Sequence, residues 1–255
     1  MSNNDNKSDN KNKDDNVVPF AKPKTKAEPK AKKQSSQKVQ TKIIMPSTDE
    51  INTQPLINLP PVTKYFLGLI VAIHLIITFG LSDQTAASIY TTYGFIPAYW
   101  SGELPFKSIT LITPLSHMLL HGSWLHITMN GLMLMAFGSG VERGVGAKNM
   151  IFIFIFSGLC GIGLQYALNP TSIHPIIGAS GGISGLFAAA FVLISRTQKQ
   201  MGAPSSSIWK FIAIWIGISV IFGLLGSPDG NAVAWMAHLG GFFGGFAALK
   251  ILKII

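Results

Sequence analysis

Long apolar runs separated by short polar segments make up the chain from residue 65 onward, whereas the first 61 residues contain no such run. A helix that crosses a lipid bilayer needs about 20 predominantly apolar residues, and tilt or local thinning of the bilayer allows some variation. Six runs have about this length, although the fourth is short: 65–81, 115–141, 150–168, 180–195, 208–225 and 232–249. The pattern predicts an all-α integral membrane protein whose six-transmembrane-helix bundle occupies residues 62–255.

The first 61 residues are a Lys- and Asn-rich segment with 11 lysines and seven carboxylates. Such a segment buries too little apolar surface to offset the entropy of ordering it, so we predict a disordered cytoplasmic tail. It lacks the apolar core and the cleavage site of a secretory signal. A nucleic-acid-binding arm is one interpretation of its lysines, but a solvated tail near anionic lipid explains the charge as well, and we expect no nucleic-acid partner.

The composition agrees with a membrane protein. Apolar residues make up 48% of the 255 positions and charged residues 12%, against about a quarter charged in soluble domains. The mean hydropathy is +0.38. The single cysteine, Cys160, excludes an intramolecular disulfide. These values exclude an ordinary soluble enzyme and a chain that is disordered throughout.

The net charge of +9 is distributed very unevenly and predicts a topology. With the tail inside and six crossings, 19 of the 20 basic residues lie on the cytoplasmic side, and only Lys107 lies outside. Basic residues concentrate in cytoplasmic loops of membrane proteins. We therefore expect a multi-pass protein of the cell inner (cytoplasmic) membrane with both termini in the cytoplasm.

The outer segment between the first two predicted spans, 82–114, is rich in aromatic residues and prolines but carries few charges. Trp and Tyr are enriched at membrane–water interfaces. We expect this first outer loop to be membrane-associated, lying partly buried in the headgroup layer, and the alternative is a plain amphipathic connector.

Polar side chains within the spans are costly and therefore informative. The second span carries His117 and His121 four residues apart, which predicts one helical face, and His126 and Asn130 on the roughly opposite face. We interpret His121 as structural, tying the outer loop to the second span. His126 and Asn130 are candidates for lining a cavity.

The fourth and sixth spans carry a serine and a histidine among glycines. Ser180 stands in Gly-Ala-Ser-Gly-Gly, and His238 is followed by Gly241 and Gly245 on the same helical face. Helices with glycine faces approach closely enough for such side chains to touch. Ser180 would then be a nucleophile and His238 its general base.

An acyl-transfer reaction also needs donors for the developing oxyanion. The backbone N–H of Ser180 lies at a predicted helix start, where amides are unpaired and the helix dipole favours negative charge. We expect His126 and Asn130 to add side-chain donors, and Gly178 to leave room for backbone to approach the substrate.

In these motifs the chain resembles the rhomboid family of intramembrane serine proteases. The likeness rests on the second-span stretch from His121 to Asn130, on Gly178-Ala-Ser180-Gly181, on Ala237-His238 with its two glycines, and on the turn from Phe137 to Arg143. The resemblance implies a bundle of the simplest type, with six spans and no seventh helix. It also implies a Ser180–His238 dyad that needs no acidic residue, metal or other cofactor. It also implies that the substrates are transmembrane segments of other proteins. Many members carry an aromatic residue four positions after the nucleophile, where this chain has Ser184, and the Trp-Arg pair often seen in the outer loop is absent.

Other functions compete with this interpretation. Gly-Ala-Ser-Gly-Gly also fits the nucleophile elbow of α/β-hydrolases, with Asp229 and His238 following in order, but that motif belongs to a soluble sheet. A metal site would use His117, His121 and His126, yet no carboxylate lies near them in the spans. The alternative we keep is a non-catalytic rhomboid-like protein that binds membrane clients, and a transporter is disfavoured by the lack of internal repeats. The sequence predicts no particular oligomeric state.

Overall fold

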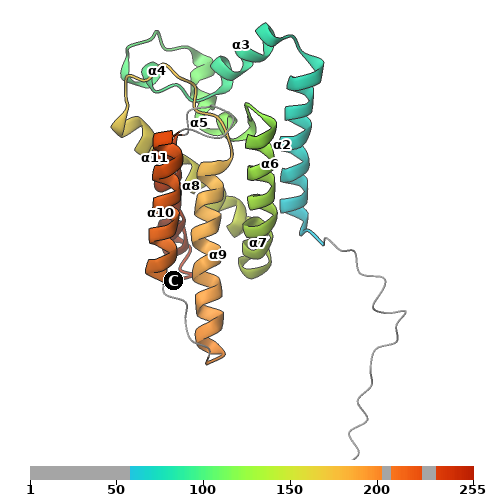
Figure 1. Ribbon diagram of the computed structural model, residues 1–255, viewed down its shortest axis with the longest axis vertical. Coiled ribbons are helices and arrows are strands. Elements are labelled where there is room, and N and C mark those ends of the chain that lie inside the picture. Colours follow the sequence, from blue (N-terminus) through green and yellow to red (C-terminus); the bar gives the residue numbers. More distant parts are fainter. Residues whose placement is uncertain (1–57, 203–207, 226–233) are drawn as a thin grey trace, which may run out of the picture. The chain divides into compact units, whose positions relative to one another are not determined.

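The computed structural model describes residues 58–202, 208–225 and 234–255, and within these ranges the secondary structure is helical apart from one isolated β-bridge (Figure 1). The prediction of an all-α fold is therefore confirmed for this part of the chain. Most of the predicted disordered tail and the turn that contains Asp229 lie outside the described residues.

The order of the elements follows the predicted runs closely, except in the second. They are α2 (Pro61–Gly80), α3 (Asp83–Tyr93), α4 (Pro97–Ser101), η1 (Ser108–Ile112), α5 (Thr113–Ser116), η2 (His117–Leu119), α6 (Trp124–Met133), η3 (Leu134–Gly138), α7 (Ser139–Val145), α8 (Ala147–Leu168), α9 (Ser180–Gln200), α10 (Ile208–Leu225) and α11 (Trp235–Ile251). Among the described residues, α2, α8 and α9 are long and apolar enough to cross a membrane, and shorter apolar helices accompany them. The fourth predicted run was expected to be short, but α9 continues to Gln200 and has 21 residues.

The second predicted span, 115–141, is not one continuous helix, so that expectation is wrong. Leu120 has an extended backbone (φ −97°, ψ 141°) that ends the short turn η2. The helix α6 begins only at Trp124, where the Ser123 hydroxyl accepts a hydrogen bond from the backbone N–H of His126. One π-helical turn, η3, then joins α6 to α7. Directly after Leu120, His121, Gly122 and Ser123 interrupt the apolar run, and Ser123 is the N-cap at which the new helix α6 begins.

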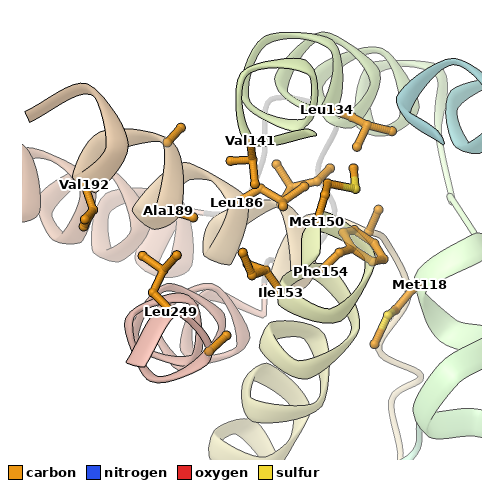
Figure 2. Close-up of a cluster of buried hydrophobic side chains, with 14 of the residues drawn as sticks. Met118, Leu134, Val141, Met150, Ile153, Phe154, Leu186, Ala189, Val192 and Leu249 are labelled. Atoms are coloured by element: carbon orange, nitrogen blue, oxygen red, sulfur yellow. The ribbon is translucent and has the colours of Figure 1, made fainter. Parts of the chain in front are cut away.

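The core lies where α8, α9 and α11 pack together. Figure 2 shows side chains from these helices gathered in one cluster, among them Ile153, Leu186 and Leu249, each fully buried. Leu134 of η3 and Ile70 of α2 belong to the same cluster and are also fully buried. Leu134 and Ile70 thereby join η3 and α2 to the three packed helices.

Glu142 of α7 caps the first turn of α2, which has no side-chain cap of its own. Its carboxylate accepts hydrogen bonds from the backbone N–H groups of Val62 (2.9 Å) and Thr63 (2.7 Å) and from the Thr63 hydroxyl (2.8 Å). Burial opposes ionisation of this carboxyl, but the hydrogen bonds from Thr63 and Val62 and the charge of Arg143 outweigh it and lower the pKa of Glu142. A carboxylate at a helix N-terminus also interacts favourably with the helix dipole.

The segment between α2 and α5 packs against the chain that leads into α9. Phe95 and Ile176 exchange two backbone hydrogen bonds, of 3.0 and 2.8 Å, and Ala98 N–H donates to the Ser172 carbonyl (3.0 Å). Phe95 and Ala98 are buried. These contacts bury part of the loop within the protein, and its partial burial in the headgroup layer stays a prediction. Figure 1 shows α3 and α4 at the same end of the helices as the start of α9.

Candidate functional site

Ser180 and His238 lie at the same level on two packed helices and are hydrogen-bonded to each other. Ser180 is the first residue of α9, and His238 lies in the first turn of α11. The distance from Ser180 Oγ to His238 Nε2 is 2.8 Å. If the ring proton is on Nδ1, the serine hydroxyl donates to Nε2, which is the arrangement that a base needs to take the proton of a nucleophile.

Glycines bring α9 and α11 this close. A Cβ built on Gly241 of α11 would lie 2.0 Å from the carbonyl oxygen of Gly181, and one built on Gly245 would lie 2.4 Å from the carbonyl oxygen of Gly185. The obstacles are backbone atoms, which cannot rotate away as a side chain can. The small residues are therefore required for the backbone approach that sets Ser180 beside His238, as the glycine pattern predicts.

Gly178 precedes the nucleophile candidate in a conformation that suits glycine. Its φ is +116°, and a Cβ there would lie 2.6 Å from His126 Nε2 and 3.8 Å from Ser180 Oγ. Its N–H donates to the His117 carbonyl (2.8 Å). Gly178 thus allows the backbone to run directly past the His126 ring, and it places that ring and the Ser180 hydroxyl around the same small space.

His126 and Asn130 lie one turn apart on α6. The structure brings the His126 ring to Gly178, where a Cβ would lie within 4 Å of both this ring and the Ser180 hydroxyl, and His126 is half-buried. Asn130 is 5% exposed, and its side-chain amide donates to the carbonyl of His126 (3.0 Å). In this conformation Asn130 therefore contacts the backbone of its own helix. A donor role toward a bound substrate stays a prediction for both residues.

His121 lies in the break before α6, so the prediction that it shares one helical face with His117 is wrong. Its ring contacts the ring of His126, with centroids 5.0 Å apart and an interplanar angle of 66°. Its carbonyl accepts hydrogen bonds from Tyr90 Oη in α3 and from His74 Nδ1 in α2, each at 3.0 Å. These bonds are of the kind expected for a residue that ties the outer loop to the second run.

Sequence reasoning left His74 and Tyr90 without a role, although both contact this cluster. The sequence did offer one signal for His74: it is an ionisable residue within the first apolar run, and such residues are costly in a membrane span. Nothing in the sequence spacing pointed from His74 to His121, which is 47 positions away. For Tyr90, no sequence signal separated it from other aromatic residues of the loop.

Ser184 occupies the position where an aromatic residue was expected from the family resemblance. It is 1% exposed, and its hydroxyl donates to the carbonyl of Ser180 (2.7 Å). The hydroxyl of Ser184 therefore forms its hydrogen bond within α9, and the side chain offers His238 no ring to stack on. The position of His238 depends instead on the glycine contacts between α9 and α11.

Histidines, cysteines and carboxylates do not converge as metal ligands in the part of the chain that the structure describes, where no three of them could hold one ion. His117, which the metal alternative would use, is hydrogen-bonded through Nδ1 to the Thr113 carbonyl (3.0 Å).

The fold and this site together define a helical membrane protein with a serine–histidine pair at the end of two glycine-packed helices. Residues 108–254 match the Rhomboid domain, and the chain belongs to the rhomboid family.

Several curated relatives share this domain. The chain is 28% identical over 196 residues to "Putative rhomboid protease YdcA" of Bacillus subtilis, covering 76% of this chain and 90% of that protein. It is 25% identical over 140 residues to rhomboid protease GlpG of Haemophilus influenzae, covering 54% of this chain and 70% of the relative. It is 29% identical over 128 residues to RHOMBOID-like protein 5 of Arabidopsis thaliana, covering 50% of this chain and 39% of the plant protein.

Proposed function

We propose that this protein is an intramembrane serine endopeptidase that cleaves transmembrane segments of other membrane proteins with a Ser180–His238 dyad. The observation that carries the proposal is the 2.8 Å hydrogen bond between Ser180 Oγ and His238 Nε2. Membership of the rhomboid family, with relatives named as proteases, supports it.

In the proposed reaction, Ser180 Oγ attacks the scissile carbonyl while His238 Nε2 takes the hydroxyl proton. His238 then gives that proton to the leaving amine, and a water molecule activated by the same ring releases the acyl group from the serine. No acidic partner is part of the proposal.

The developing oxyanion would be stabilised from two elements. The backbone N–H of Ser180 is at the N-terminus of α9, whose 21 residues supply a full helix dipole. His126 is the side-chain donor whose ring already lies beside Gly178, and Asn130 would add a second donor by releasing the carbonyl of His126. Losing one such donor costs on the order of 100-fold in rate.

We also propose six membrane crossings with both termini in the cytoplasm, in the cytoplasmic membrane of a cell. α2, α8 and α9 have the length for a span, and α10 and α11 fit at 18 and 17 residues. The second crossing would consist of α6 and η3 and would end at Val141 in α7, as in the predicted span. Reporter fusions after each predicted span test this topology, and an outward-facing C-terminus would contradict it.

The enzymatic test uses the purified full chain in detergent with a model single-span substrate. We expect cleavage by the wild type and none by Ser180→Ala or His238→Ala. Matched controls are Ser195→Ala, a serine near the other end of α9, and His174→Ala, an exposed histidine. Both controls should cleave as the wild type does. A serine-reactive fluorophosphonate should label the wild type and leave Ser180→Ala unlabelled.

Cleavage by Ser180→Ala at the wild-type rate would overturn the dyad. A wild type that binds the substrate without cleaving it and resists the fluorophosphonate would favour the alternative, a non-catalytic protein that binds membrane clients. The replacement of the usual aromatic residue by Ser184 is the feature that keeps this alternative in view.

A further inference from the structure

A histidine of α2 is fixed against the break that precedes α6. His74 is 2% exposed, and its Nδ1 lies 3.0 Å from the carbonyl oxygen of His121. A carbonyl only accepts hydrogen bonds, so the ring proton of His74 is on Nδ1. The same ring packs edge-to-face on Trp124, the first residue of α6, with centroids 4.7 Å apart. His74 is thus held by one hydrogen bond and one ring contact, both to the segment that carries His126.

His121 transmits this contact to the candidate site. Two donors from different helices, His74 Nδ1 and Tyr90 Oη, converge on its carbonyl oxygen. The ring of His121 is 0% exposed and lies edge-to-face against the ring of His126. The His126 ring in turn borders Gly178, on whose Cβ side the Ser180 hydroxyl also lies. A continuous chain of contacts therefore runs from α2 to the place where the oxyanion would form.

The histidine cluster is unfavourable as a device for stability. Within the described residues, Nε2 of His74 is buried without a hydrogen-bond partner. A buried polar atom left without a partner is destabilising, and an apolar ring of the same shape would avoid that cost at His74. Polar groups that break a local rule of this kind are concentrated at functional sites.

From these contacts we infer that His74 is a positioning residue, which orients His126 as an oxyanion donor through His121. The inference rests on the proposed function and adds a residue from a helix that the proposed reaction does not otherwise use. Without His74, Tyr90 still bonds to the His121 carbonyl, so the fold persists while the His121 and His126 rings lose one constraint. Misalignment of a catalytic group lowers the rate without weakening substrate binding.

The test compares three variants of the full chain in the cleavage assay. His74→Phe keeps the ring but removes the donor, and we expect a loss of about tenfold in kcat, an unchanged KM, and a melting temperature equal to or above that of the wild type. His74→Asn keeps an N–H near the position of Nδ1 and should restore most of the lost kcat. Leu75→Phe, at the next and more exposed position of α2, is the matched control and should match the wild type.

A double-mutant cycle with Tyr90→Phe tests whether the two donors act on one carbonyl. Because they share that acceptor, we expect the loss of log kcat in the double variant to exceed the sum of the two single losses. An additive result would show that His74 does not act through the His121 carbonyl and would overturn the inference.

Two other outcomes overturn the inference while leaving the proposed function intact. One is a wild type that cleaves and a His74→Phe variant with the same kcat. The other is a His74→Phe variant whose kcat and melting temperature fall together and are not restored by His74→Asn, which indicates a merely structural role. If instead the wild type neither cleaves nor reacts with the fluorophosphonate, the proposed function fails and the positioning role fails with it.

Discussion

Substitution of Gly241 by alanine tests whether glycine packing sets the geometry of the candidate dyad. The new Cβ would lie 2.0 Å from the carbonyl oxygen of Gly181, whereas ordinary contacts begin at 3.4 Å. The backbones of α9 and α11 must therefore separate by about 1.4 Å at this level to relieve the clash. Ser180 precedes Gly181 directly, so its 2.8 Å hydrogen bond to His238 would stretch beyond hydrogen-bonding distance.

We expect this separation to lower kcat/KM by about 100-fold or more, because a displacement of about 1 Å is enough for such a loss. Overpacking should also lower the free energy of unfolding by about 1–3 kcal/mol. The assays are substrate cleavage and thermal unfolding in the same detergent. Gly163→Ala on α8 is the control, since a Cβ there meets nothing within 4 Å, and it should be neutral or slightly stabilising. Wild-type cleavage by Gly241→Ala would refute the argument that this glycine contact determines the dyad geometry.

Further predictions concern the cap of α2 and the approach to Ser180. Glu142→Gln should lower the free energy of unfolding by about 2 kcal/mol because it removes a charged acceptor of three hydrogen bonds, whereas Glu103→Gln at an exposed position should have no measurable effect. Because the pKa of Glu142 is lowered by folding, its stabilisation is present above the unfolded value near 4.5 and is lost as the pH falls through the folded pKa. The difference in melting temperature between the wild type and Glu142→Gln should therefore shrink toward zero on acidification, and a constant difference would contradict the cap. Gly178→Ala should lower cleavage by about 100-fold, since φ is +116° and a Cβ would meet the His126 ring; an active variant would show that this approach is not required.

The apolar runs were sufficient to predict the helical class and several boundaries. α9 begins at Ser180 and α10 covers Ile208–Leu225, as the runs predict. These boundaries can be predicted because glycine and polar residues interrupt the apolar pattern on both sides. The second run was predicted as one span, although His121, Gly122 and Ser123 interrupt its apolar residues directly after Leu120. Ser123 is a residue type that favours the N-cap, and it marks the start of α6, but an average of hydropathy does not contain that signal.

The candidate pair Ser180–His238 was predictable because both residues stand among glycines that mark a close helix contact. The histidine cluster was not predictable, for a different physical reason. A helical face can be derived from spacing along one helix, but His121 lies outside any helix. Its contacts with His126, Tyr90 and His74 depend on how three separate elements fold against the break.

The irregular part of the second run and the irregular segment before α9 are linked by backbone hydrogen bonds. Irregular backbone at membrane depth must find its hydrogen bonds within the protein. Gly178 N–H donates to the carbonyl of His117, and Ile176 pairs with Phe95 of the outer loop. Each irregular segment thus supplies partners that the other, or the loop beside it, requires. These hydrogen bonds allow α9 to begin at Ser180. Because Ser180 is the first residue of the helix, its backbone N–H has no partner within the helix. The outer loop is accordingly part of the construction of the site, and weakening the Phe95–Ile176 bridge should disturb Ser180 before it disturbs the packed helices below.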